Sequence, residues 1–191
     1  GPNAKRAFSP RPSRAGPAKT VDQVPLEWCY GPGVVLDVRH LESNDAATVD
    51  DLRAALDRIG HRLVAGDIVL VQTGNDRLWG QRRYHLRGPG VSAAATRWLV
   101  DHGIRMTGID AWGWDQPLDV QAREAKRENR DDVFWAAHFV GVEREYCHME
   151  RLANLNRLPA TGFRVCAFPL KVSGGSAGPA RVVALVDEDR H

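Results

Sequence analysis

Apolar runs and helix-like spacing alternate along the chain from residue 21 onward. Runs rich in β-branched residues predict strands at 33–38, 67–74, 104–111, 163–172 and 180–187. Between the first two strands, apolar positions share one face of a predicted helix that begins after Thr48 and ends at Gly60. A second helix is predicted to begin near Ser92 and to end at 101–103. This alternation predicts an α/β fold with a mixed sheet.

Two polar segments interrupt this pattern. Residues 75–90 form a predicted loop rich in arginine and aromatic side chains, and residues 117–136 carry charges of both signs. The mixed charges indicate a solvated helix, or a helix followed by a loop, and we assign no chemistry there.

Length and composition indicate one domain without a membrane segment. With 191 residues and 43% hydrophobic content, the chain can bury one substantial core, which we place in residues 21–187, with 188–191 as a tail. It has no run of eighteen apolar residues and no readable signal peptide, so we expect a cytoplasmic protein. The three cysteines Cys29, Cys147 and Cys166 lie far apart and form no CxxC pattern, which argues against a disulfide framework.

The positive charge belongs to residues 1–20, which we predict to be a disordered arm rich in proline. This arm contains five lysines and arginines and no acid before Thr20, so removing them from the net charge of +2 leaves −3 for the rest. A nucleic-acid-binding arm is one interpretation of this charge. Because aromatic residues are scarce there, a solvated tail is the preferred interpretation and a nucleic-acid partner is not expected.

The common catalytic signatures are absent from the sequence. There is no P-loop, no GxGxxG after a strand, no GxSxG and no HExxH. The tripeptide at 148–150 matches the HxE of zinc deaminases, but the PCxxC that should follow is missing, so we set a deaminase aside. Most histidines are isolated near turns or at the terminus, where a hydrogen-bonded surface role is ordinary. They are His40, His61, His85, His102 and His191.

His138 and Glu150 are two possible metal ligands, twelve positions apart. This spacing places them on no fixed face of a helix or strand, so the spacing alone is weak evidence. Imidazole and carboxylate suit zinc and manganese equally.

Five segments are distinctive and follow one another without large gaps between about residues 20 and 187. They are 24–40 (VPLEWCYGPGVVLDVRH), 66–74 (GDIVLVQTG), 108–117 (GIDAWGWDQP), 138–163 and 167–185. Together they resemble the cyclase family of metal-dependent hydrolases, which includes bacterial kynurenine formamidase and isatin hydrolase. The resemblance implies the swivelling β/β/α fold of that family, with a mixed sheet, and a homo-oligomer, either a dimer or a tetramer.

The resemblance also implies a metal site and a reaction. Family members hold zinc or manganese with an N-terminal HxGTHxDxxxH motif and a later His and Glu twelve residues apart, and His138 and Glu150 match that pair. A metal-activated water would attack the carbonyl of an N-formyl aromatic amine, as in an arylformamidase of tryptophan catabolism to kynurenine. A cyclic amide of the isatin type is the alternative small-molecule substrate.

The chain departs from the family because it contains no HxGTHxDxxxH motif. The resemblance therefore implies an N-terminally truncated chain in which the family's catalytic histidine is missing. Two ligands rarely hold a catalytic metal, so we expect weak metal binding and little hydrolysis by this polypeptide alone. A non-catalytic remnant of the fold is the alternative interpretation.

Asp110, Trp112 and Trp114 are further candidates because they follow the predicted strand 104–111. The two indoles could wall a pocket for an aromatic ring or could simply pack in the core. Asp110 could orient a ligand histidine or could cap the turn after its strand. The sequence leaves both pairs of alternatives open.

Overall fold

The computed structural model describes residues 18–130 and 132–186. Nearly all of the predicted basic arm and the predicted tail at 188–191 lie outside the described residues. No helix within the described ranges is long and apolar enough to span a membrane.

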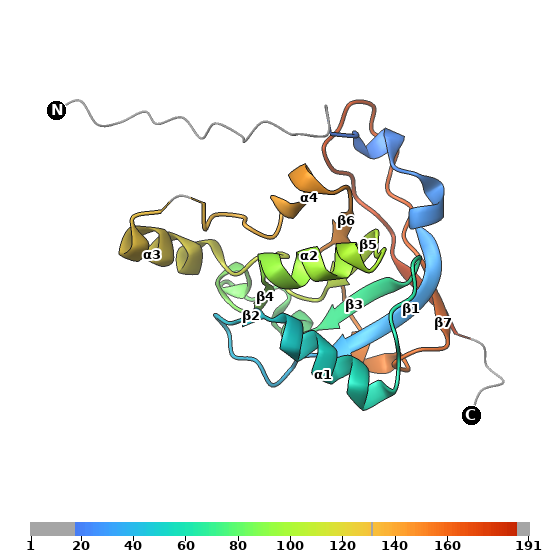
Figure 1. The fold of residues 1–191 in the computed structure, drawn as a ribbon, viewed down its shortest axis with the longest axis horizontal. Coiled ribbons are helices and arrows are strands. Elements are labelled where there is room, and N and C mark those ends of the chain that lie inside the picture. The colour runs from blue at the N-terminus through green and yellow to red at the C-terminus, as the bar shows by residue number, and fades with distance from the viewer. Residues whose placement is uncertain (1–17, 131, 187–191) are drawn as a thin grey trace.

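A six-stranded mixed sheet forms the centre of the molecule (Figure 1). In spatial order its strands are β6 (Cys147–Met149), β5 (Met106–Ile109), β3 (Ile68–Gln72), β1 (Tyr30–Asp37), β7 (Phe163–Cys166) and β8 (Val183–Val186). The first four run parallel to one another, whereas β7 and β8 are antiparallel to their neighbours. The predicted α/β fold with a mixed sheet is confirmed.

Two helices cover one face of this sheet. Helix α1 (Val49–Ile59) begins at a reciprocal capping box between Thr48 and Asp51 and ends at Gly60 in the left-handed conformation, as the sequence predicts. Helix α2 (Ala93–Asp101) begins at Ser92, whose hydroxyl accepts a hydrogen bond from the backbone N–H of Ala95. Their apolar faces and the inward side chains of β1 and β3 form one core cluster.

The opposite face of the sheet has its own core cluster. Strand alternation sends Val35 to this side, where it joins Ile68 and Leu70 of β3 and Phe163 of β7. Gly33 of β1 is paired with Phe163, and a methyl group at Gly33 would lie 2.1 Å from the phenyl ring. The chain therefore needs glycine at this position for close contact between β1 and β7.

The polar segments hold short 3-10 helices that the sequence pattern did not resolve and one helix that it predicted. The predicted loop 75–90 contains the 3-10 helices η3 (Asn75–Leu78) and η4 (Tyr84–Leu86), and 117–136 contains α3 (Leu118–Glu128). The remaining short elements are η1 (Val21–Gln23), η2 (Leu26–Trp28), α4 (Val140–Glu143), η5 (Leu155–Arg157) and a two-stranded sheet of β2 (Ala46–Ala47) and β4 (Gly90–Val91).

The predicted strand 163–172 is too long. Strand β7 ends at Cys166, and only an isolated bridge from Pro169 to Ala180 continues the pairing. Proline has no N–H to donate to a ladder, so regular pairing stops before Pro169.

Candidate metal centre and adjoining pocket

The carboxyl ends of β5 and β6 bring the candidate residues together. These strands are parallel neighbours, with Thr107 opposite His148 and Gly108 opposite Met149. The loop after β5 supplies residues 110–117, while Glu150 directly follows β6. Side chains that leave parallel strands at the same edge converge there, which is where ligands bind in open α/β sheets.

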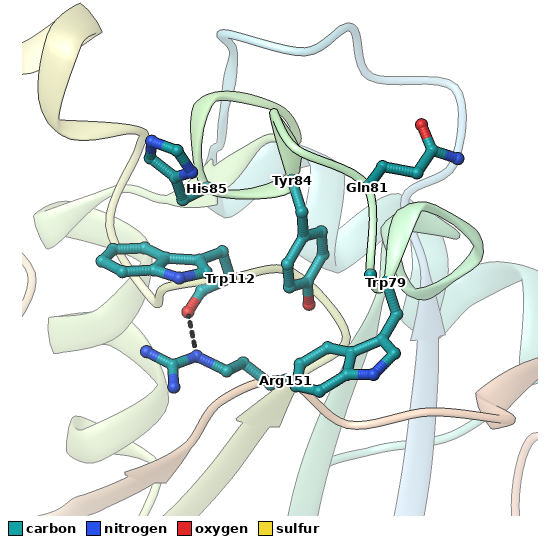
Figure 2. Close-up of a pocket in the computed structure, with 7 residues that line it drawn as sticks. Trp79, Gln81, Tyr84, His85, Trp112 and Arg151 are labelled. Atoms are coloured by element: carbon teal, nitrogen blue, oxygen red, sulfur yellow. Dashed lines mark hydrogen bonds between the residues drawn. The ribbon is translucent and has the colours of Figure 1, made fainter.

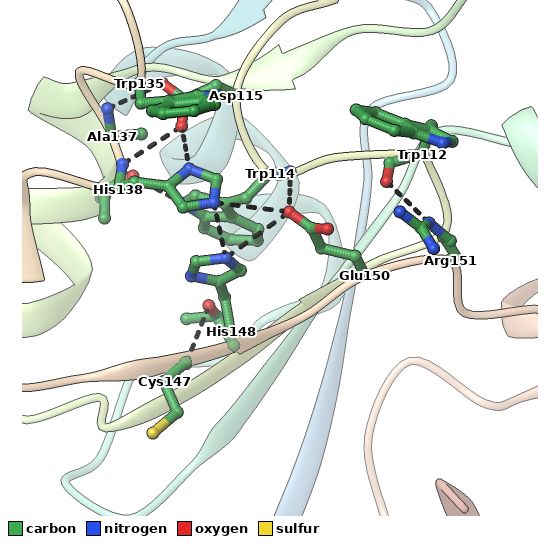
Figure 3. Close-up of polar contacts among 12 residues, drawn as sticks. Trp112, Trp114, Asp115, Trp135, Ala137, His138, Cys147, His148, Glu150 and Arg151 are labelled. Carbon is green, nitrogen blue, oxygen red and sulfur yellow. Dashed lines mark hydrogen bonds and ion pairs between the residues drawn. The ribbon is translucent and has the colours of Figure 1, made fainter. Parts of the chain in front are cut away.

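Three side chains from this region form a tight cluster (Figure 3). The Nε2 atoms of His138 and His148 are 3.1 Å apart, and Oε1 of Glu150 lies 3.6 Å from the first and 3.5 Å from the second. All three side chains are partly buried: 38% of the His138 side chain, 19% of the His148 side chain and 26% of the Glu150 side chain are exposed. Three potential ligand atoms therefore converge on one point that is partly shielded from solvent.

The spacing of these donors suits a divalent metal. Bonds of about 2.0–2.1 Å to a tetrahedral zinc place its ligands about 3.3–3.4 Å apart, and the three observed separations bracket that value. Two imidazoles and one carboxylate are also a donor set that zinc and manganese accept. The residues present can thus hold a metal ion, with a coordination position left for water.

Asp115 fixes the orientation of His138. Its carboxylate accepts hydrogen bonds from the backbone N–H groups of Ala137 and His138 at 2.8 and 3.1 Å. One of its oxygens lies 2.5 Å from Nδ1 of the His138 ring (Figure 3). When Nδ1–H donates to this carboxylate, the lone pair of Nε2 is directed toward the cluster, which is the arrangement that metal-binding histidines use.

Trp114 supports the other two members of the cluster. Its backbone N–H donates to Oε1 of Glu150 at 2.9 Å, and its indole stacks on the His148 ring at a centroid distance of 5.9 Å. The indole is fully buried and donates through Nε1 to Thr96 at 3.0 Å. This anchoring limits the movement of both side chains.

The hydrogen bonds to Glu150 outweigh the effect of its burial. Burial raises the pKa of the Glu150 carboxyl, but hydrogen bonds from His148 and the Trp114 backbone, together with the charges of His148 and His138, bring the pKa below its usual value. Glu150 is therefore ionised at neutral pH, as a metal ligand requires.

The structure brings together His138 and Glu150, the two residues selected from the sequence, but it separates Asp110 from them. Asp110 accepts hydrogen bonds from the backbone N–H of Thr73 at 2.7 Å, from the Thr73 hydroxyl at 2.6 Å and from the N–H of Gly74 at 2.8 Å. It therefore caps the turn after β3, and the carboxylate that orients a histidine is that of Asp115.

The two predicted tryptophans have different positions. Trp114 is buried and packs in the core, which is one of the two alternatives that the sequence left open. Trp112 does line a pocket of about 340 Å³, together with Trp79, Gly80, Gln81, Tyr84, His85 and Arg151 (Figure 2). Figure 3 shows Trp112 and Arg151 of this pocket beside Glu150, so the pocket adjoins the cluster.

Sequence reasoning missed His148 as a member of the cluster. The signal was present, because residues two apart on a strand point to the same side, and His148 and Glu150 have that spacing. It was overlooked because the three-residue strand β6 lacks the apolar alternation that would have identified it.

Three other histidines have the ordinary hydrogen-bonded roles predicted for them. His61 lies 2.9 Å from Asp67, and His102 lies 2.8 Å from the carbonyl of Trp98. His40 is 3.3 Å from the helix-capping Asp51. His85 lines the pocket, and His191 lies outside the described residues.

The fold and the three-donor cluster define a mixed α/β protein with a candidate divalent-metal centre. The chain belongs to the cyclase family. The model of this family, described as putative cyclase, matches residues 4–116. That match ends before His138, so the cluster is an observation separate from it. A search of curated proteins found no match.

Solved structures of an isatin hydrolase and of a predicted metal-dependent hydrolase are similar to this chain. Isatin hydrolase A from Labrenzia aggregata, bound to benzyl benzoate, is 27% identical with a TM-score of 0.76 over 93% of this chain and 69% of its own. A predicted metal-dependent hydrolase from Bacillus stearothermophilus is 31% identical, with a TM-score of 0.60. This match covers 85% of this chain and 66% of that hydrolase.

A further isatin hydrolase, bound to the product analogue thioisatinate, is 24% identical with a TM-score of 0.75 and shares the fold. Its match covers 88% of this chain, and the chain spans 64% of the length of that isatin hydrolase.

Proposed function

We propose that this protein is a metal-dependent hydrolase that cleaves the amide bond of an aromatic substrate. The observation that carries this proposal is the convergence of His138, His148 and Glu150 on one point. Membership of the cyclase family and likeness to isatin hydrolases and other metal-dependent hydrolases support it.

The protein's own residues would prepare the site for zinc or manganese. His138, His148 and Glu150 would be the ligands, Asp115 would hold the His138 ring, and Trp114 would hold the Glu150 carboxylate. When bound, such an ion lowers the pKa of a coordinated water and polarises a carbonyl oxygen. The prediction of weak metal binding was based on two donors, and the third donor, His148, removes that reason.

Two substrate classes remain, and the isatin hydrolases among the similar structures favour the first of them. A ring amide fused to an aromatic ring, as in isatin, is the first substrate to test. An N-formyl aromatic amine, the substrate of an arylformamidase in tryptophan catabolism, is the second. In both cases water is added across a carbonyl–nitrogen bond next to an aromatic group, so Trp112 could contact the ring in either substrate.

Metal content tests the proposal most directly. The purified full chain should retain about one zinc or manganese ion after dialysis, since three protein ligands suffice in catalytic sites. His148→Ala should lose most of this metal. His102→Ala is the matched control, because His102 ends helix α2 and its ring contacts the Trp98 carbonyl instead of the cluster. Equal metal retention by His148→Ala and the unaltered chain would contradict the assignment.

Hydrolysis assays separate the remaining alternatives. The metal-loaded chain would be incubated with isatin and with N-formylkynurenine, and loss of each substrate would be followed by absorbance. Turnover of either one identifies the substrate class. Tight metal binding without turnover of either would favour the non-catalytic alternative that the missing HxGTHxDxxxH motif suggests.

A cytoplasmic location and assembly into a dimer or tetramer are also part of the proposal. Both come from the family resemblance and the sequence. Fractionation of the source cells and light scattering of the purified chain would test them.

A further inference from the structure

The pocket beside the candidate metal centre contains a cation in an aromatic setting (Figure 2). The Arg151 guanidinium lies over the Trp112 indole, 5.0 Å from the ring centroid, and its Nε donates to the Trp112 carbonyl at 3.3 Å. On the far side of the pocket, the rings of Trp79 and Tyr84 meet edge to face at 5.5 Å. A planar ligand could therefore contact aromatic surfaces and a positive charge at the same time.

The backbone of Arg151 adopts a conformation that arginine seldom uses. Its φ is +60°, in the left-handed region that favours glycine and asparagine, and its N–H donates to the carbonyl of Ala111 at 2.9 Å. Such a conformation costs free energy and persists only where the surrounding structure imposes it, often at a functional site. Here the side chain lies against Trp112, with its guanidinium beside the Trp112 carbonyl (Figure 3).

Arg151 has no carboxylate partner within ion-pair distance in the described part of the chain, unlike Arg97, Arg123 and Arg144. Its Nε is used by Trp112, but the two terminal amino groups of the guanidinium have no protein acceptor within the described ranges. A guanidinium with both terminal groups available presents the paired donors that a carboxylate accepts.

We infer that Arg151 and Trp112 form a binding site for aryl carboxylates. This inference rests on the proposed hydrolase function and narrows its substrate. Hydrolysis of a ring amide breaks the carbonyl–nitrogen bond, gives the carbon a hydroxyl and the nitrogen a hydrogen, and the resulting acid loses its proton to water. One product then carries both the aromatic amine and a carboxylate.

Hydrolysis of an N-formyl aromatic amine distributes the two new groups over two products. The new carboxylate leaves as formate, and the aromatic product gains only an amine at the reaction centre. In N-formylkynurenine a carboxylate is also present, but it lies at the end of the amino-acid side chain, farther from the ring than the carboxylate that ring opening creates. A guanidinium stacked directly on the aromatic wall therefore matches the product of ring opening better and gives Arg151 the role of a specificity-determining residue.

The test is a binding measurement on the full chain after removal of metal with EDTA. Anthranilate (2-aminobenzoate) is the anionic probe, and anthranilamide is its neutral counterpart of nearly the same shape. Binding would be followed by the indole N–H signals of the six tryptophans in a ¹⁵N-labelled sample. Without metal, a carboxylate cannot gain affinity by coordination to the candidate centre.

We expect the unaltered chain to bind anthranilate about tenfold more tightly than anthranilamide, the preference that a charge-assisted pair of hydrogen bonds gives. Arg151→Asn should abolish the preference and preserve the fold, because asparagine accepts a φ of +60°. Arg105→Met is the matched control, because Arg105 lies 6.0 Å from the ring of Trp28, outside the pocket.

Several results would overturn the inference. Equal affinities for the two probes, no binding of either at millimolar concentration, or an equal loss of both in Arg151→Asn would each show that Arg151 does not recognise an anion. Anthranilate binding without any amide turnover would instead reject the hydrolase function and leave the binding site in place.

Discussion

Asp115→Asn should weaken metal binding while preserving the shape of the site. The Asp115 carboxylate is only 9% exposed and accepts three hydrogen bonds, two of them from His138. An asparagine in its place has one oxygen, which can accept from His138 or from Ala137 but not from both. The side-chain NH2 group of the asparagine would then lie opposite one of these N–H groups, so that two donors face each other without an acceptor.

Two magnitudes follow from this geometry. Loss of an outer carboxylate on a ligand histidine typically lowers metal affinity 10- to 100-fold, or about 1.4–2.7 kcal/mol. A buried donor left without an acceptor costs about 1–3 kcal/mol of folding stability. We therefore expect both the affinity for metal and the melting temperature to fall.

Competition with a chromophoric chelator, using zinc and then manganese, measures the first effect, and thermal unfolding of the metal-free protein measures the second. Asp101→Asn is the control, since within the described residues Asp101 forms a surface ion pair with Arg144, away from the cluster. If Asp115→Asn bound zinc and manganese as tightly as the unaltered chain, the role given to Asp115 would be refuted.

Three predictions concern the scaffold. Gly33→Ala should lower the free energy of unfolding by about 1–3 kcal/mol in urea titrations, because its methyl group would overlap the Phe163 ring. Gly60→Ala meets no neighbouring atom, so only the left-handed φ of +64° should cost stability, about 1 kcal/mol. Asp51→Asn should cost about 1 kcal/mol at pH 7 by weakening the cap with Thr48. Burial raises the pKa of Asp51, but hydrogen bonds with Thr48 outweigh it and lower the pKa, so this difference should shrink as the pH falls below about 4. An undiminished difference at pH 2.5, or unchanged stability of either glycine variant, would contradict these assignments.

The elements that the sequence predicted well are those whose signals are local. Helix α1 carries its own start at Thr48, its apolar face and its end at Gly60, and all three are observed. Strand β3 is buried over its whole length and appears in the sequence as one apolar run. Neither element needs information from distant parts of the chain to be recognised.

Strand β6 could not be predicted in the same way. It has three residues, lies at the edge of the sheet and, within the described residues, pairs with β5 alone. Its formation depends on the register between Thr107 and His148, which are 41 positions apart. The same dependence explains why only two of the three cluster residues were predicted. His138 and Glu150 were chosen by spacing and resemblance, whereas His148 became a neighbour through strand pairing.

Asp115 was overlooked for a related reason. An acid in a loop usually faces solvent, and nothing in the sequence indicates that residues 137 and 138 fold back against it. Asp110 as the orienting carboxylate was one of two alternatives, and it placed the right chemistry five residues too early. Both acids follow the same strand, and only the path of the loop separates their partners.

That loop links the two candidate sites physically. At its start, the Asp110 carboxylate binds Thr73 and Gly74 and so anchors the loop to the end of β3. Farther along, Trp112 faces the pocket, and Asp115 faces His138. Residues two or three positions apart on an anchored loop cannot move independently, so a ligand held against Trp112 lies at a fixed distance from the metal-binding cluster. In Figure 3, Trp112 and Arg151 lie on one side of Glu150, and His138 and His148 lie on the other. The pocket and the candidate metal centre therefore adjoin each other through Glu150, as the proposed function requires of a substrate site and its metal.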